Sequence, residues 1–168
     1  MNQIAKIAPG ALMLASESAS DAPQAEALIE AAFGPGRFAK AAERVRERAA
    51  FAPDLSFCAW RDGAMVGTVR MWRARVGETP VVFLGPIAVT CAERSGGVGA
   101  VLVERACEAA ALAGETAIVL VGDEPYFGRF GFQVAGGVSL PGPVDPGRVL
   151  AKSLRPQGPA LAGLIEAR

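Results

Sequence analysis

The sequence has 168 residues, in which 17 Lys and Arg balance 17 Asp and Glu, 51% of residues are hydrophobic and histidine is absent. This length and apolar content predict one globular domain. A zero formal charge excludes a basic protein whose affinity rests on nucleic-acid phosphates. The lack of histidine excludes Ser-His and Cys-His hydrolases and removes the commonest metal ligand, so we expect no metal site.

The cysteine content and the N-terminal region indicate the cellular compartment in which the protein is expected to work. Cys58, Cys91 and Cys107 form no CxxC pair and fit neither a disulfide scaffold nor a zinc site. We interpret them as small buried side chains in a reducing cytoplasm. The apolar run 11–15 follows a Pro-Gly pair and is too short to span a bilayer or to serve as a signal peptide. The expected location is the cytoplasm, without a membrane partner.

The first half of the chain changes from helical to strand periodicity. We expect a strand over 12–17, then a helix that Ser20 or Asp21 caps and that ends near Gly34. A second, highly charged helix should cover 38–50, with most of its circumference in solvent. Two strands, 55–61 and 64–76, should then pair as a hairpin, because an Asp-Gly turn separates them.

The second half predicts a strand, a helix and a parallel strand. Residues 81–89 are apolar throughout, as in a strand covered on both faces, but Pro86 after Gly85 predicts a bulge or a break in pairing. An amphipathic helix over 97–113 and a buried strand over 116–121 follow. A short helix within 123–130 and extended runs at 132–134 and 149–154 complete an α/β fold with a mixed sheet.

A glycine-rich loop joins the apolar strand to the amphipathic helix. Its glycines allow backbone amides to approach a ligand, and the following helix N-terminus attracts negative charge, which suits a pyrophosphate. The alternative is a tight turn without a ligand. Neither the GxGxxG spacing nor a Walker A motif is present. The residues of this loop are Arg94, Ser95, Gly96, Gly97, Val98, Gly99 and Ala100.

A second informative segment, 121–132, begins at the carboxyl end of the second parallel strand and reads VGDEPYFGRFGF. Open α/β sheets bind ligands at this edge. The alternative is an aromatic cluster that seals the end of the sheet.

Together, these segments make the sequence resemble the GNAT superfamily of N-acyltransferases, within it bacterial acetyltransferases with LGPLAV, RxxGxG and VLVGDPxYYxRFGF-like stretches. The matching stretches are 84–89, 94–99 and 119–132, and the likeness runs from about residue 25 to 154. The resemblance implies an α+β fold with a mixed, mostly antiparallel sheet, a splayed pair of parallel strands and flanking helices. It also implies one acyl-CoA N-acyltransferase domain over 1–168, with 155–168 as a C-terminal tail.

The same resemblance implies a reaction and its binding residues. An acetyl group passes from acetyl-CoA, the co-substrate, to a primary amine of a small molecule or peptide by direct attack. The backbone of Ile87, Ala88 and Val89 should bind the pantetheine arm, and residues 94–100 should hold the pyrophosphate. A homodimer is consistent with the superfamily, and the apolar run 160–165 would dock on the domain or on a partner subunit.

The general acid of the family is usually a tyrosine five residues before the last Phe of the GF pair, and that position holds Phe127. The single tyrosine, Tyr126, stands one residue earlier. Either Tyr126 reaches the sulfur as catalytic acid, or the thiolate leaves without one, since a thiol pKa of about 8.5 makes it a fair leaving group.

The sequence does not identify the general base of the reaction or the acceptor amine. Asp123, Glu124 and Glu78 are candidate bases, with a water relay as the alternative. If Arg70, Arg73 and Arg75 project into an acceptor groove, an anionic acceptor is favoured; otherwise they are surface charges paired for solubility. Other functional readings are a catalytically weak acyl-CoA-binding or sensing module and an acyltransferase for longer acyl or carrier-protein thioesters.

Overall fold

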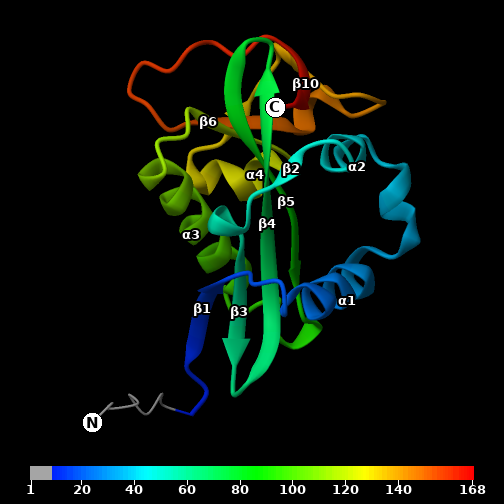
Figure 1. Ribbon diagram of the computed structural model, residues 1–168, viewed down its shortest axis with the longest axis vertical. Coiled ribbons are helices and arrows are strands. Elements are labelled where there is room, and N and C mark those ends of the chain that lie inside the picture. The colour runs from blue at the N-terminus through cyan, green and yellow to red at the C-terminus, as the bar shows by residue number, and fades with distance from the viewer. Residues whose placement is uncertain (1–8) are drawn as a thin grey trace.

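A computed structural model describes residues 9–168, so the first eight residues of the expected domain lie outside it. One ten-stranded sheet forms the centre of this part, with α3 on one side and α1 and α2 on the other (Figure 1). The helices are α1 (Ala22–Phe33), α2 (Ala41–Arg46), α3 (Val98–Leu112) and α4 (Glu124–Phe127). The strands are β1 (Leu12–Ser16), β2 (Ala50–Phe51), β3 (Phe57–Arg61), β4 (Ala64–Val76), β5 (Thr79–Val89), β6 (Ala117–Val121), β7 (Gln133–Val134), β8 (Val138–Ser139), β9 (Val149–Ser153) and β10 (Gly163–Ala167).

The main path of the sheet runs β1-β3-β4-β5-β6-β9-β7. Its pairs are antiparallel except for β5 and β6, which are parallel as the intervening helix α3 predicts. The mixed, mostly antiparallel sheet with flanking helices is therefore confirmed. Within the described residues no helix has both the length and the apolar character needed to cross a bilayer.

Strand β5 is buried on both faces, as its uninterrupted apolar sequence predicts. Val82 and Leu84 point into the core beneath α3, whereas Val81 and Phe83 point into a second core beneath α2 and β10. Leu102 lies on the face of α3 that packs against the first core and is fully buried. Two cores on opposite faces hold β5 in the middle of the molecule.

Strands β5 and β6 separate soon after they meet. Backbone pairing joins Val82 to Ile118 and Phe83 to Val119, and no later pair is formed although both strands continue. At the same place the β4–β5 register shifts around Gly85-Pro86, where Trp72 Nε1 donates a 2.7 Å hydrogen bond to the Gly85 carbonyl. The expected break at Pro86 is thus confirmed, and it opens a gap between two central strands.

The predicted helix over 38–50 is wrong in its extent. Lys40 has an extended backbone (φ −83°, ψ 145°), so a 3₁₀ turn, Pro35–Ala39, ends before α2 begins, and the chain after α2 pairs with β4 as β2. The expectation that its charges are solvated is also wrong in part, since the side chains of Arg46 and Glu43 are only 10% and 13% exposed.

The C-terminal segment docks on the domain itself. Strand β10 pairs antiparallel with β4 and parallel with β8, and Ile165 is buried in the core beneath α2. Of the three cysteines, Cys58 and Cys107 are buried as expected, but Cys91 is exposed because it lies in the turn after β5.

Helix α3 packs closely against β4 at Gly67, which leads to a stability prediction. A Cβ at Gly67 would lie 2.9 Å from both Leu102 Cδ1 and Val98 Cγ1. We expect Gly67→Ala to lower the free energy of unfolding by about 1–3 kcal/mol, because this core has no room for the methyl group. Urea denaturation measures the change. The control Gly136→Ala, where a Cβ meets nothing within 4 Å, should change stability by less than about 0.5 kcal/mol; equal effects would refute the close packing.

The cysteines should differ in reactivity. Burial raises the pKa of Cys58 to about 11 and also raises the pKa of Cys107, so near pH 8 both stay protonated and unreactive. We expect iodoacetamide to modify Cys91 in the folded protein and the other two after unfolding in urea, as measured by peptide mass spectrometry. Labelling of Cys58 as fast as that of Cys91 would contradict the packing.

Candidate active site

The N-terminus of α3 offers unpaired backbone donors. Gly97 precedes the helix with a left-handed backbone (φ +79°), and no side chain caps the helix there. The amides of Val98, Gly99 and Ala100 therefore lack the partners that helix residues further along have. The turn before them is anchored to β3 by Arg61, whose Nε lies 2.7 Å from Glu93 Oε1. A 15-residue helix thus directs its positive end into a fixed loop.

A cavity of about 590 Å³ lies over this terminus, and we name it the cradle cavity. Nine of the eleven site residues predicted from the sequence line it. The other two do not: Val98 is buried in the core beneath α3, and Gly96 lies in the turn against Glu93. The nine are Ile87, Ala88, Val89, Arg94, Ser95, Gly97, Gly99, Ala100 and Tyr126.

Three further residues of the cradle cavity were not assigned a role from the sequence. Ala32 and Phe33 come from the end of α1, which reaches the cavity through the tertiary fold. Arg129 lies in the RFGF stretch, and its guanidinium stacks 4.6 Å from the centre of the Tyr126 ring. Arg129 adds a second cation to Arg94, and its place within the 121–132 segment was the available signal in the sequence.

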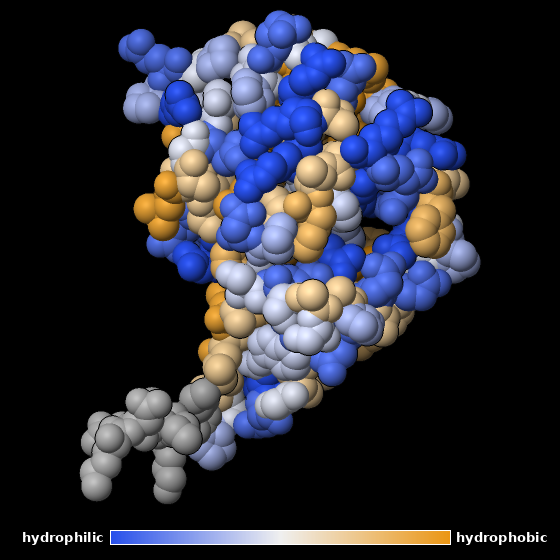
Figure 2. Space-filling model, in the orientation of Figure 1, coloured by the Kyte–Doolittle hydropathy of each residue, from blue (hydrophilic) through white to orange (hydrophobic). Residues whose placement is uncertain are grey.

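A second cavity, of about 540 Å³, lies where β5 and β6 part, and we name it the splay cavity. Residues 83–87 of β5 and residues 120–123 at the end of β6 and just after it line one side, and residues of the α1–α2 region form a wall. The face of the molecule in Figure 2 is hollowed between α1 and α2, which is where this wall lies. Phe33, Ile87 and Phe127 line both cavities, so the two meet at these side chains.

The two aromatic residues of α4 face different parts of this system. The Tyr126 hydroxyl lies against Gly99, 3.2 Å from where a Cβ would stand, and is therefore on the cradle side. The Phe127 ring covers Gly122, whose Cβ position would lie 2.3 Å from Phe127 Cε2. A glycine at 122 is required for this contact, and it sets Phe127 at the junction of the cavities.

Of the three candidate bases, Asp123 lines the splay cavity. Its Oδ1 lies 3.2 Å from Arg148 Nε. Glu124 turns back toward Gly128, and Glu78 is fully exposed in the β4–β5 turn. Geometry therefore singles out Asp123 among the three.

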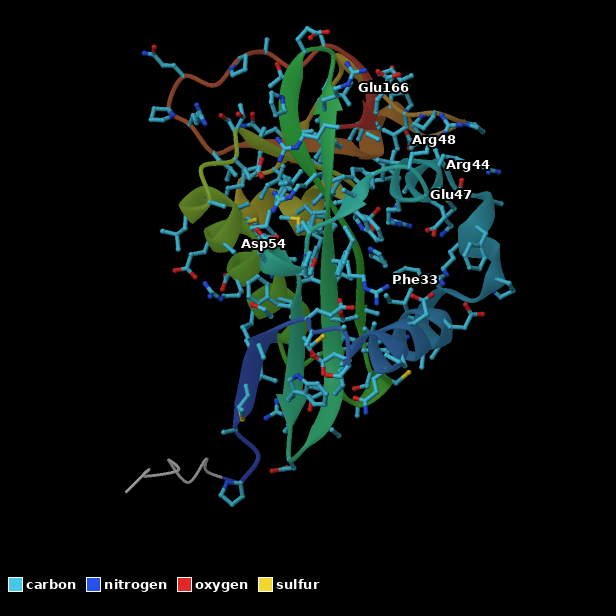
Figure 3. All side chains as sticks on the ribbon, viewed as in Figure 1. Phe33, Arg44, Glu47, Arg48, Asp54 and Glu166 are labelled. Atoms are coloured by element: carbon cyan, nitrogen blue, oxygen red, sulfur yellow. The ribbon has the colours of Figure 1, made fainter. Side chains whose placement is uncertain are left out.

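The hypothesis that Arg70, Arg73 and Arg75 project into an acceptor groove is wrong, because none of them lines either cavity and each guanidinium is paired with carboxylates. Arg70 Nη2 lies 2.7 Å from Glu17, Arg73 Nη2 lies 2.7 Å from Asp54, and Arg75 Nη2 lies 2.8 Å from Glu166. Arg70 also pairs with Glu26, and Arg73 with Glu115. Asp54 and Glu166 are labelled in Figure 3, on either side of β4. The paired-charge alternative accounts for these arginines.

The arrangement suits an extended ligand with an anionic end. Residues Gly67, Thr68 and Val69 of β4 pair with residues 87–89 of β5 on one edge, but β6 has already moved away from the other. Backbone groups on that free edge are open to a ligand that runs from the cradle cavity to the splay cavity. Its anionic end would meet the α3 amides, Arg94 and Arg129.

Comparison with solved structures shows the same architecture. YhbS, a GNAT family N-acetyltransferase from Escherichia coli solved with CoA, has a TM-score of 0.79 and 23% identity, covering 97% of this chain and 93% of that one. A GNAT family acetyltransferase from Brucella melitensis, solved with acetyl-CoA, has a TM-score of 0.70 and 23% identity, and the match covers 95% of this chain and 97% of that one. Arabidopsis thaliana Naa50, solved with a bisubstrate analogue, has a TM-score of 0.60 and 16% identity, and the match covers 84% of this chain and 98% of that one.

At these identities the similarity shows the fold. No curated protein matches the sequence. A family model, however, described as the acetyltransferase (GNAT) family, matches residues 23–132, which is more than half of the chain and includes both cavity-lining motifs. The chain belongs to the GNAT family of acetyltransferases.

Proposed function

We propose that this protein transfers the acetyl group of acetyl-CoA to a primary amine in a ternary complex. The observation that carries the proposal is the junction of two cavities at Phe127, one over the free N-terminus of α3 and one between β5 and β6. Family membership and the CoA and acetyl-CoA of the E. coli and Brucella structures support it.

In this proposal the cradle cavity holds the CoA moiety. The amides at the start of α3 donate to the pyrophosphate, and the guanidinium groups of Arg94 and Arg129 add charge-assisted hydrogen bonds. The pantetheine arm bonds to the free edge of β5 at residues 87–89. This path directs the thioester toward the gap at Gly85.

The acceptor amine then approaches from the splay cavity. Its nitrogen attacks the thioester carbonyl carbon, a C–N bond forms, the C–S bond breaks, and a proton leaves the nitrogen for Asp123 or a water that Asp123 binds. The thiolate of CoA departs at the junction of the two cavities, toward which the Tyr126 hydroxyl would turn from its place against Gly99. We assign Tyr126, the single phenol of the chain, as the donor of its proton.

A second candidate follows from Phe127. A ring without a hydroxyl at the junction of the cavities favours a protein that binds acyl-CoA and turns it over slowly, as a sensing module would. Longer acyl or carrier-protein thioesters are a further alternative. In each case we propose that the protein works in the cytoplasm, and that any homodimer leaves both cavities open.

Calorimetric titration tests the cofactor assignment. We expect acetyl-CoA and free CoA to bind and ATP to bind far more weakly, because ATP has no pantetheine arm for β5. Arg94→Ala and Arg129→Ala should each weaken acetyl-CoA binding about five- to tenfold. Arg48→Ala, an exposed arginine of another surface, is the matched control and should bind normally. Absence of binding to both CoA forms would refute the proposed function.

Substitutions in α4 test the assignment of the acid. We expect Tyr126→Phe to lower kcat for CoA release by about 10²-fold at neutral pH, because the proton donor is lost. The double variant Tyr126→Phe with Phe127→Tyr should recover turnover, since it sets a phenol over Gly122 at the cavity junction. Full turnover by Tyr126→Phe would instead mean that the thiolate leaves unprotonated and that Tyr126 serves packing.

A further inference from the structure

Two largely buried arginines line the splay cavity. Arg37 comes from the 3₁₀ turn after α1, and Arg46 from the last residue of α2. Their side chains are only 9% and 10% exposed. Charged side chains are rarely buried without a partner that uses their donors, so each donor needs to be accounted for.

Arg46 uses one edge of its guanidinium for the protein. Nε and Nη2 donate to Glu43 Oε2 at 3.0 and 2.7 Å. Within the described residues Nη1 makes no hydrogen bond, and it lies 3.4 Å from where a Cβ would stand on Gly85. One pair of N–H groups therefore reaches the point at which β5 and β6 separate, where the proposed reaction takes place.

Arg37 also has an unused donor. Its Nη2 bonds to Glu26, but Nε, although buried, has no hydrogen-bond partner in the described part of the chain. Glu30 lies 3.7 Å from that nitrogen, too far for a hydrogen bond. The unsatisfied Nε leaves the positive charge of Arg37 incompletely compensated beside the cavity, which favours an anion there.

The two cations also affect each other. Burial lowers the pKa of Arg46, Glu43 opposes this shift, and the positive charge of Arg37 lowers the pKa further. Two like charges that face one cavity repel each other, and an anion between them relieves this repulsion. The same cavity is lined by Lys40 and Arg148 and by the carboxylates of Asp123 and Asp145, and Asp123 Oδ1 lies 3.2 Å from Arg148 Nε. Four cationic side chains therefore line the cavity against two carboxylates, which favours an anionic group in it.

We propose that the amine acceptor carries a compact anionic group, a carboxylate or a phosphate-like group, which Arg46 and Arg37 bind in the splay cavity while its amino group faces Asp123. This inference rests on the proposed acetyl transfer and names its substrate class: small amines that are anionic at one end. Guanidinium groups bind carboxylate and phosphate alike, so the probes must include both.

Conjugates that join CoA to an acceptor mimic test the proposal without requiring turnover. Each has CoA sulfur linked through a CH₂–CO group to an amine chain that ends in a carboxylate, a phosphonate or a neutral carboxamide, in a short series of chain lengths. At one or more lengths, we expect an anionic conjugate to bind at least about tenfold more tightly than its carboxamide twin in calorimetry. The anionic group whose conjugate gains more affinity over the carboxamide is the group that we expect the natural acceptor to carry.

Variants assign this preference to the arginine. Arg46→Met should abolish it while leaving the affinity for free CoA unchanged, and Arg46→Lys should retain part of it. Because Arg46→Met leaves Glu43 without its partner, Glu43→Gln with Arg46→Met keeps the local charge balanced and should give the same result. The matched control is Arg48→Met, an exposed arginine in the turn after α2 that lines a separate surface cavity with Glu166 (Figure 3), and it should keep the full preference.

The outcomes separate the two proposals. Equal affinity for anionic and neutral conjugates at every length, with normal CoA binding, would overturn the anionic acceptor and leave acetyl transfer standing. A preference that persists in the Arg46→Met variant would overturn the role of Arg46. Failure of free CoA and of every conjugate to bind would overturn the proposed function itself and the acceptor class with it.

Discussion

The separation of β5 from β6 is the constraint on which the rest of the molecule depends. Two parallel strands that pair at Phe83 and Val119 and then part leave backbone groups without a neighbouring strand. The backbone groups on the other edge of each strand pair with a neighbouring strand, those of β5 with β4 and those of β6 with β9. The unpaired inner edges then face a gap that connects both cavities, so the ligand path is a consequence of incomplete pairing in the sheet.

Buried ion pairs hold the wall of this gap in place. Arg70 of β4 joins Glu17 after β1 and Glu26 of α1, and Glu26 also binds Arg37. Glu26 is half-exposed, but removing one partner from the buried Arg70–Glu17 pair costs about 3–5 kcal/mol, because the remaining charge stays in a poorly solvated place. The charge-rich region around α1 and α2 is therefore structural on one side and supplies guanidinium donors to the splay cavity on the other.

Local patterns in the sequence predicted most of the fold. The Asp-Gly turn gave the β3–β4 hairpin, helical spacing gave α3, and Gly85-Pro86 marked the break in β5. The helix expected over 38–50 failed because β2 pairing with β4, a contact distant in sequence, outweighs helix propensity there. The cradle residues were found because they are contiguous, whereas Arg129, Phe33, Arg37 and Arg46 come together from separate segments.

The sequence by itself determined the β3–β4 hairpin, the helix α3, the break in β5 and the glycine-rich loop, since these depend on neighbouring residues. Only the tertiary structure decided which arginines are paired and which present free donors. Arg70, Arg73 and Arg75 look the same as Arg46 in the sequence, yet the first three meet carboxylates from distant elements, whereas Arg46 pairs with Glu43 of its own helix and directs Nη1 toward Gly85. Charge pairing acts through space over a few ångströms, and the fold alone sets those distances.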